Sequence, residues 1–121
     1  MSTITDLVDR YLASWNETDA RRRRELIAAV WAENASYVDP LMTSDGHDGI
    51  DAMIAAVQAR FPAHRFSRLG TIDAHNDRLR FGWELTPEGG EPIAAGTDFA
   101  VVANGRLQSV TGFLDRVPNM D

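Results

Sequence analysis

The spacing of the apolar residues changes about halfway along this chain of 121 residues. Up to about residue 61 they recur every three or four positions, which is typical of amphipathic helices. Beyond that point they alternate with polar residues, most clearly over 78–86, as in strands with one buried face. Helices followed by strands predict an α+β domain. Because no linker or repeat interrupts the pattern, we expect one domain over residues 1–121.

Two helices are predicted first. An apolar stripe places one over residues 5–16, where Ser2 or Thr3 can cap its N-terminus. The second follows Thr18, which we expect to be its cap. Its apolar side consists of Leu26, Ile27, Val30 and Trp31.

A short strand and a third helix are predicted next. The strand covers 35–39 and ends at Pro40, which has no N–H to donate to a ladder. After a loop over 41–46, we expect Asp48 to cap the third helix and Pro62 to end it.

The rest of the chain is predicted to form a meander of strands over 64–75, 78–86, 93–103 and 107–114. Asn104-Gly105 is its strongest turn signal and is typical of a type I′ hairpin. So long a sheet twists and curls, and the helices then cover its open side. We therefore expect a cone-shaped α+β barrel, with three N-terminal helices packed on a strongly curved antiparallel sheet around an apolar pocket.

Composition excludes several function classes. The net charge of −6 disfavours a nucleic-acid partner, and the lack of cysteine excludes a thiolate metal site or a cysteine nucleophile. No metal-ligand spacing and no glycine-rich phosphate loop is present, so we expect no metal and no cofactor. No apolar run approaches the roughly 20 residues that cross a bilayer. We expect a cytoplasmic protein without a membrane partner.

Asp39 is the first candidate for chemistry. It shares one face of its short strand with Tyr37, so an inward Tyr37 brings Asp39 inward as well. An apolar pocket would raise the pKa of this carboxyl and suit it to proton transfer near neutrality. The other interpretation is structural, because an aspartate before Pro40 commonly bonds nearby backbone amides in a turn.

Asp98 is the second candidate, because a charge between apolar residues in mid-strand needs a reason. Counting back from Asn104-Gly105 pairs Asp98 with Thr111 and puts Thr111 and Phe113 on its face. That face is small and apolar with a few polar groups, which suits a pocket lining. Alternatively, Asp98 is structural and bonds Thr111 or an arginine.

Aromatic residues supply the remaining candidates. Tyr11 lies in the first apolar stripe, as a core residue or as a hydroxyl donor to the pocket. Trp15 and Trp83 are core or pocket wall. The opposite face of the Asp98 strand carries Phe99 and is also apolar, which predicts a homodimer.

This organisation resembles the nuclear transport factor 2-like superfamily, and within it the SnoaL-like branch, which includes polyketide cyclases. The resemblance covers nearly the whole chain and marks the fold better than the reaction. Its markers are Trp31-Ala32-Glu33-Asn34-Ala35, Tyr37-Val38-Asp39-Pro40, Gly46-His47-Asp48-Gly49-Ile50 and Gly105-Arg106-Leu107.

A sharper resemblance is to ketosteroid isomerase of the same superfamily. It implies that Asp39 is a general base, and that Tyr11 and a protonated Asp98 donate hydrogen bonds to the substrate oxygen. Two departures count against the steroid substrate: the segment between Tyr11 and Asp39 is longer, and Leu114 stands where an aromatic residue is expected.

We therefore expect a pocket for a small apolar molecule in a cofactor-independent isomerase, cyclase or dehydratase, with proton transfer by aspartate next to a carbonyl. The alternative is a non-catalytic binding or dimeric assembly module, and epoxide opening is a weaker third hypothesis. The residues expected to contact the ligand are Trp15, Tyr37, Trp83, Thr111 and Phe113.

Overall fold

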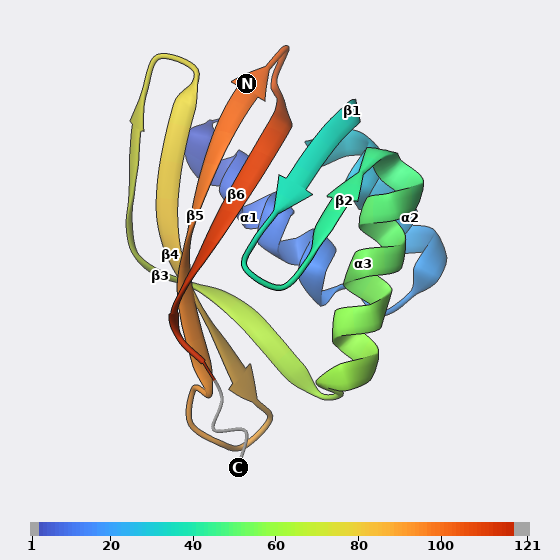
Figure 1. The fold of residues 1–121 in the computed structure, drawn as a ribbon, viewed down its shortest axis with the longest axis vertical. Coiled ribbons are helices and arrows are strands. Elements are labelled where there is room, and N and C mark those ends of the chain that lie inside the picture. The colour runs from blue at the N-terminus through green and yellow to red at the C-terminus, as the bar shows by residue number, and fades with distance from the viewer. Residues whose placement is uncertain (1–2, 118–121) are drawn as a thin grey trace.

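The computed structural model describes residues 3–117, which contain three helices and six strands. The helices are α1 (Ile4–Asn16), α2 (Ala20–Val30) and α3 (Gly46–Arg60). The strands are β1 (Trp31–Val38), β2 (Thr43–Asp45), β3 (His64–His75), β4 (Arg78–Pro87), β5 (Ala94–Ala103) and β6 (Arg106–Arg116). The long, twisted strands curve around the helices (Figure 1). The predicted α+β class is confirmed.

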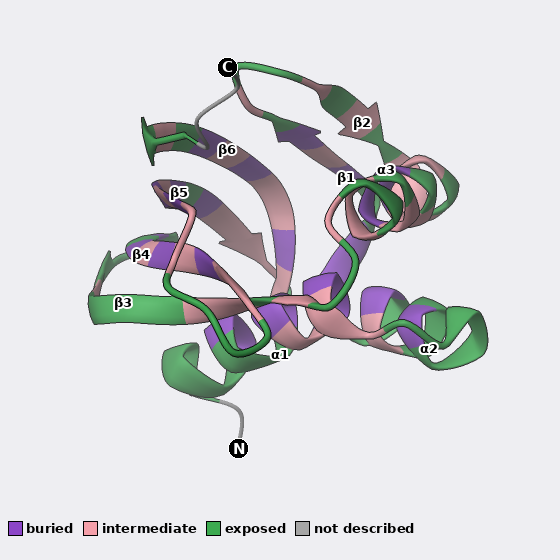
Figure 2. Cartoon of the chain, turned by 90° about the horizontal axis from the view of Figure 1, so that it is seen from below, coloured by how far each residue is buried: buried purple, intermediate pink, exposed green. Residues whose placement is uncertain are grey.

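The six strands form one sheet in the order β2-β1-β6-β5-β4-β3. Neighbouring strands are antiparallel except β1 and β6, which are parallel, so the expectation of a wholly antiparallel sheet is wrong for this pair. Both β2 and β3 are edge strands. The curved sheet therefore does not close into a barrel, and the helices cover its concave side (Figure 2).

Carboxylate and hydroxyl groups fix the starts of the first two helices. Thr3 and Asp6 form a capping box on α1, with the Asp6 N–H donating to Thr3 Oγ1 at 3.0 Å. Asp19, not Thr18, caps α2 and accepts from the Arg22 N–H at 2.9 Å. The prediction of Thr18 was wrong by one residue, because an ionised carboxylate one position later is at least as good an acceptor for the free N–H groups.

The second helix leads directly into β1, which begins at Trp31 rather than at residue 35. Residues 43–45, expected in a loop, pair with β1 as the short strand β2. The cap of α3 is Asp45, with no side-chain bond, and Asp48 lies in the first turn instead of capping it. Asp48 forms an ion pair with Arg24 of α2 at 2.7 Å.

The β5–β6 hairpin forms where it was predicted, with Asn104 and Gly105 both at positive φ of 54° and 78°. Its register, however, shifts between Val101 and Val102, because β6 has one extra residue there. Val102 lies opposite Leu107, whereas Val101 lies opposite Ser109. From Val101 to Gly96, every pair is therefore displaced by one residue from the simple count.

The bulge changes which side chains share a face with Asp98. Asp98 lies opposite Gly112, not Thr111, and the prediction of that pair was wrong. Thr111 and Phe113 lie opposite Phe99 and Thr97 on the outer face of the sheet. Phe113 is 56% exposed there, so neither Thr111 nor Phe113 lines the interior with Asp98.

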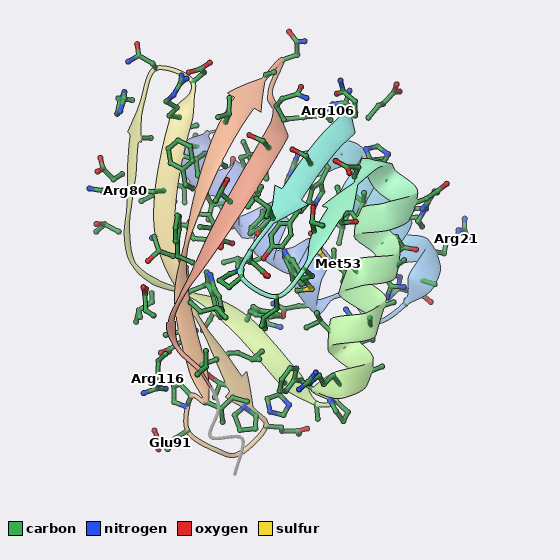
Figure 3. The ribbon with its side chains drawn as sticks, in the orientation of Figure 1. Arg21, Met53, Arg80, Glu91, Arg106 and Arg116 are labelled. Carbon is green, nitrogen blue, oxygen red and sulfur yellow. The ribbon has the colours of Figure 1, made fainter. Side chains whose placement is uncertain are left out.

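Seven aromatic rings from α1 and three strands pack against one another in the interior, with centroids 5.3 to 6.4 Å apart. Charged side chains such as Arg21, Arg80 and Glu91 project outward, and Met53 of α3 is buried (Figure 3). Within residues 3–117, no helix combines the length and the apolar character that a bilayer crossing needs. The rings belong to Tyr11, Trp15, Trp31, Tyr37, Phe66, Phe81 and Trp83.

Candidate functional site

Asp98 of β5 is a buried carboxyl group, only 4% exposed, on the inner face of the sheet. The Tyr11 hydroxyl donates to its Oδ2 at 2.6 Å, and the Trp83 indole N–H donates to its Oδ1 at 3.0 Å. These three residues come from α1, β4 and β5, so the bonds join the first helix to the centre of the sheet. The hydrogen-bond partners of Asp98 are therefore Tyr11 and Trp83, and not Thr111 or an arginine as the structural alternative predicted.

The surroundings change the acidity of this group. Burial raises the pKa of Asp98 from 3.8 to about 6, although the bonds from Tyr11 and Trp83 act in the opposite direction. The negative charge of Asp39 raises the pKa of Asp98 further. Burial, and next the Asp98 charge, raise the pKa of Tyr11 well above its ordinary value. Asp98 therefore gains and loses its proton near neutral pH, while Tyr11 stays protonated.

Asp39 follows β1 and is half-buried. Its Oδ1 accepts from the backbone N–H groups of Leu41 and Met42 at 2.8 and 2.9 Å, which forms the turn that precedes β2. Its Oδ2 accepts from the Tyr37 hydroxyl at 2.7 Å. Burial, and next the Asp98 charge, raise the pKa of Tyr37, so this hydroxyl remains a donor. Asp39 thus has a structural turn on one side and a buried phenol on the other.

The side chains of Asp39 and Asp98 both lie against Gly112 of β6. A Cβ atom at this position would lie 3.0 Å from Asp98 Oδ1, 3.1 Å from the Tyr37 hydroxyl and 3.2 Å from Asp39 Cβ. The Asp98 carboxylate, the Tyr37 hydroxyl and the Asp39 side chain therefore approach the same point of the backbone, which only glycine leaves open. Sequence reasoning missed Gly112, although a glycine inside a strand is itself a signal of close approach.

Trp15 is a further buried aromatic residue beside Tyr37. It is 5% exposed, and its ring packs against Tyr37 and Phe66 with centroids 5.6 and 5.4 Å away. Its indole N–H has no hydrogen-bond partner among residues 3–117. A buried donor without a partner costs about 1–3 kcal/mol. The sequence placed Trp15 and Trp83 in the core or the pocket wall but gave no sign of this difference between them.

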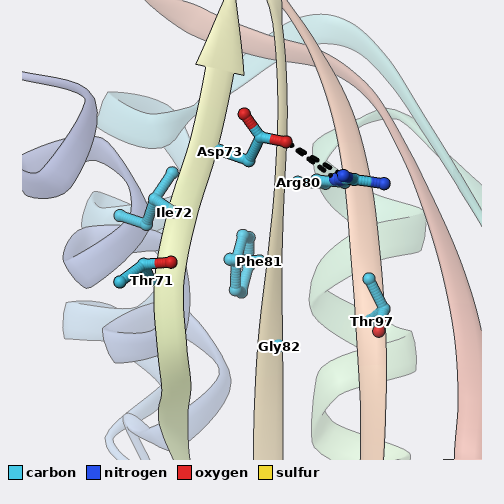
Figure 4. Close-up of a pocket in the computed structure, with 7 residues that line it drawn as sticks. All are labelled: Thr71, Ile72, Asp73, Arg80, Phe81, Gly82 and Thr97. Carbon is cyan, nitrogen blue, oxygen red and sulfur yellow. Dashed lines mark hydrogen bonds and ion pairs between the residues drawn. The ribbon is translucent and has the colours of Figure 1, made fainter.

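Two surface hollows are seen over the described residues, and neither is lined by Asp39, Asp98 or Tyr11. One, of about 520 Å³, lies over β3, β4 and β5 beside the Asp73–Arg80 ion pair (Figure 4). The other, of about 400 Å³, lies on α2. Next to Asp98 lie the rings of Tyr11 and Trp83, which donate to its two oxygens. Within residues 3–117, no three His, Cys, Asp or Glu side chains gather as metal ligands.

The raised pKa of Asp98 makes stability depend on pH. The unfolded chain loses this proton near pH 3.8 and the folded chain near pH 6, so folding favours the protonated form. The contribution to the free energy of unfolding is full below pH 3.8 and is lost as the pH rises to about 6. We expect wild type to lose about 2–3 kcal/mol relative to Asp98→Asn between pH 4 and 7.

Urea unfolding of both proteins at several pH values measures this difference. The other carboxylates are present in both proteins, so their contributions cancel when the free energy of unfolding of the variant is subtracted from that of wild type. A difference between the two proteins that stays constant with pH, or that grows in favour of wild type as the pH rises, would contradict the assignment.

Comparison with known proteins agrees with this fold. The sequence profile of the SnoaL-like domain matches residues 8–110. A candidate isomerase of the SnoaL-like family from Agrobacterium tumefaciens is 46% identical, over 92% of this chain and 96% of its own, with a TM-score of 0.88. No curated protein matches this chain in sequence.

More distant solved structures share the fold alone. A candidate polyketide cyclase from Sinorhizobium meliloti is 17% identical over 88% of this chain and 93% of its own, with a TM-score of 0.70. An NTF2-like protein of unknown function from Cytophaga hutchinsonii is 13% identical over 95% and 92%, with a TM-score of 0.68. The family resemblance inferred from the sequence is confirmed, and this chain belongs to the SnoaL-like family.

Proposed function

We propose that this protein binds a small apolar carbonyl compound and acts as an isomerase, cyclase or dehydratase. The observation that supports this most is that the side chains of two aspartates lie against Gly112, one of them with a buried carboxyl group whose pKa is near 6. Such a pair of acids in different surroundings suits one to accept a proton and the other to hold one. Relatives described as a candidate isomerase and a candidate polyketide cyclase agree with this class.

Asp39 is the proposed base. It takes the proton from the carbon next to the carbonyl, and the electrons of that C–H bond move to form an enolate. Return of the proton to another carbon gives an isomer. Attack of the enolate on a second carbonyl closes a ring, and the new alkoxide takes the proton back from Asp39. Loss of a hydroxyl group together with that proton, as water, gives a dehydrated product. One proton-transfer step therefore serves all three reactions.

Tyr11 and protonated Asp98 are the proposed donors to the enolate oxygen, toward which the Tyr11 hydroxyl turns from Asp98 Oδ2 when the ligand binds. Tyr11 keeps its proton because its pKa is raised, and the neutral form of Asp98 is well populated near pH 6. Fixed donors in a dry site stabilise a developing oxyanion by several kcal/mol. Trp83 holds the Asp98 carboxyl in place from the other oxygen. Trp15, Tyr37 and Trp83 remain the proposed ligand contacts.

Eight half-buried apolar side chains among the described residues pack against the core. The ligand is proposed to enter past four of them, which come from different segments. Phe66 pairs with Leu85, whose carbonyl accepts from the Ile93 N–H, so these residues lie at one end of the sheet. The Met42 carbonyl accepts from the backbone N–H of the proposed base. Rotation of these side chains would open a path beside that base. The four are Met42, Phe66, Ile93 and Leu114.

The base assignment is tested with 2-tetralone, an apolar bicyclic ketone with exchangeable protons next to its carbonyl. We expect the protein to speed their exchange with D₂O and Asp39→Asn to lower that rate by at least about 100-fold. The fold should survive, because the amide keeps an oxygen for the Leu41 and Met42 N–H groups. Proton NMR measures the exchange, and thermal unfolding checks the fold.

Asp73→Asn is the matched control, because Asp73 is an exposed strand carboxylate paired with Arg80. We expect it to leave the exchange rate unchanged. Equal exchange rates in wild type and Asp39→Asn would rule out Asp39 as the base.

The second candidate function is a non-catalytic binding module. It is favoured by the turn that Asp39 forms, because this turn alone accounts for an aspartate at that position. This alternative predicts exchange of 2-tetralone no faster than in buffer, together with a lower melting temperature for Asp39→Asn.

We also propose a homodimer formed through the outer face of the sheet. Val38, Phe99 and Phe113 are 46%, 37% and 56% exposed on neighbouring strands β1, β5 and β6. The register places all three on the face opposite Asp98. Adjacent apolar side chains of this size favour contact with a second surface of the same kind.

Sedimentation velocity tests the dimer directly. We expect wild type to sediment as a dimer at micromolar concentration and Phe113→Asp to sediment as a folded monomer, because the charge would be buried in the interface. Arg21→Asp, on the exposed side of α2 and away from the outer face of the sheet, is expected to stay dimeric. Wild type that is monomeric throughout the concentration range would contradict the proposal.

A further inference from the structure

The three tryptophans of the chain differ in how their indole N–H groups are used. Trp83 donates to Asp98 at 3.0 Å, and Trp31 donates to Ser14 Oγ at 3.4 Å. Trp15 is equally buried, at 5% exposure, but its N–H finds no acceptor within residues 3–117. Buried donors in folded proteins nearly always have a partner. The unpaired Trp15 N–H is therefore unusual, and it is a donor available inside the candidate site.

The position of this donor connects it with the proposed oxygen site. Trp15 lies one helical turn after Tyr11 on the buried side of α1. Burial and the Asp98 charge raise the pKa of Tyr11, whereas hydrogen bonding by the Trp15 N–H lowers it. This N–H nevertheless has no acceptor at normal hydrogen-bond distance, so it faces the Tyr11 hydroxyl from too far away for a full bond.

The ring of Trp15 also reaches the second carboxylate. It packs on Tyr37 at 5.6 Å, and the Tyr37 hydroxyl donates to Asp39 at 2.7 Å. On its other side it contacts Phe66, one of the half-buried residues at the proposed opening. Trp15 thus lies between the proposed base, the proposed oxygen donors and the path by which a ligand enters.

We propose that the Trp15 indole N–H is a specificity-determining donor that binds an acceptor oxygen of the ligand beside the Tyr11 hydroxyl. This rests on the proposed function, because it assigns a third donor to the same carbonyl or enolate oxygen. An indole N–H donates but never accepts, so it favours a carbonyl oxygen over a hydrocarbon. Because it does not titrate, its contribution is independent of pH, unlike that of Asp98.

The test compares 2-tetralone with tetralin, the hydrocarbon that lacks the carbonyl oxygen. Indole N–H signals of the tryptophans are followed by ¹⁵N–¹H NMR, with Trp15 assigned by its loss in Trp15→Phe. We expect 2-tetralone to move the Trp15 proton signal downfield, as a new hydrogen bond does, and tetralin not to do so. The Trp31 signal is the internal control, because its N–H already has a partner.

The substitution gives a second measurement. Trp15→Phe removes the donor together with part of the ring, and tetralin binding reports the loss of packing alone. The variant should therefore weaken 2-tetralone binding about tenfold and tetralin binding far less. This preference for the ketone should be lost equally at pH 5 and pH 8. Absence of a downfield shift in the wild-type protein, or an unchanged ketone preference in folded Trp15→Phe, would overturn the inference.

The two proposals fail in different ways. Binding of 2-tetralone with a shifted Trp15 signal but no proton exchange supports the donor and rejects the catalytic function. Exchange that Asp39→Asn abolishes, together with an unmoved Trp15 signal, supports the catalytic function and rejects the donor.

Discussion

The interior of this protein is organised around one buried carboxyl group. Asp98 accepts from Tyr11 on one oxygen and from Trp83 on the other, and so joins α1 to the centre of the sheet. An unpaired carboxylate in an aromatic interior would cost several kcal/mol, so both donors are needed to keep it there. The same burial that must be offset by these bonds also raises the pKa of Asp98 into the neutral range. Stability and proposed chemistry therefore depend on the same contacts.

Two glycines allow neighbouring side chains and strands to pack closely around the Asp98 carboxyl group. At Gly112 there is room for Asp98, Tyr37 and Asp39 to approach one point of β6. At Gly96, two residues before Asp98, a Cβ atom would lie 2.3 Å from the Phe113 carbonyl and 2.4 Å from the Trp83 ring. Because neither strand can move away without breaking its ladder, larger residues at these positions would push Trp83 or Asp98 out of place.

Much of the fold could be predicted from local patterns. The strand over 64–75 and the hairpin at Asn104-Gly105 follow from alternation and turn chemistry, which depend on neighbouring residues only. The face shared by Thr111 and Asp98 depended on counting through a bulge near Val102, and one extra residue reverses the side chains that follow it. Nothing in the sequence around Gln108 marks that extra residue.

The candidate site, like the fold, could be predicted from the sequence only in part. Tyr11 and Asp98 were singled out because each is a polar group in an apolar pattern, and the structure places them in contact. That Tyr37 would face Asp39 followed from strand periodicity. The free N–H of Trp15 and the contacts between the aromatic rings depend on three-dimensional packing, and no spacing of residues reveals them.

The central claim is that Asp98 keeps its proton to near neutral pH inside the folded protein. The most direct measurement is the ¹³C NMR titration of its side-chain carboxyl carbon, assigned by comparison with a protein lacking that group. We predict a midpoint near pH 6. A midpoint at or below the ordinary value of 3.8 would mean that the group is solvated or held as an anion, and would contradict the account.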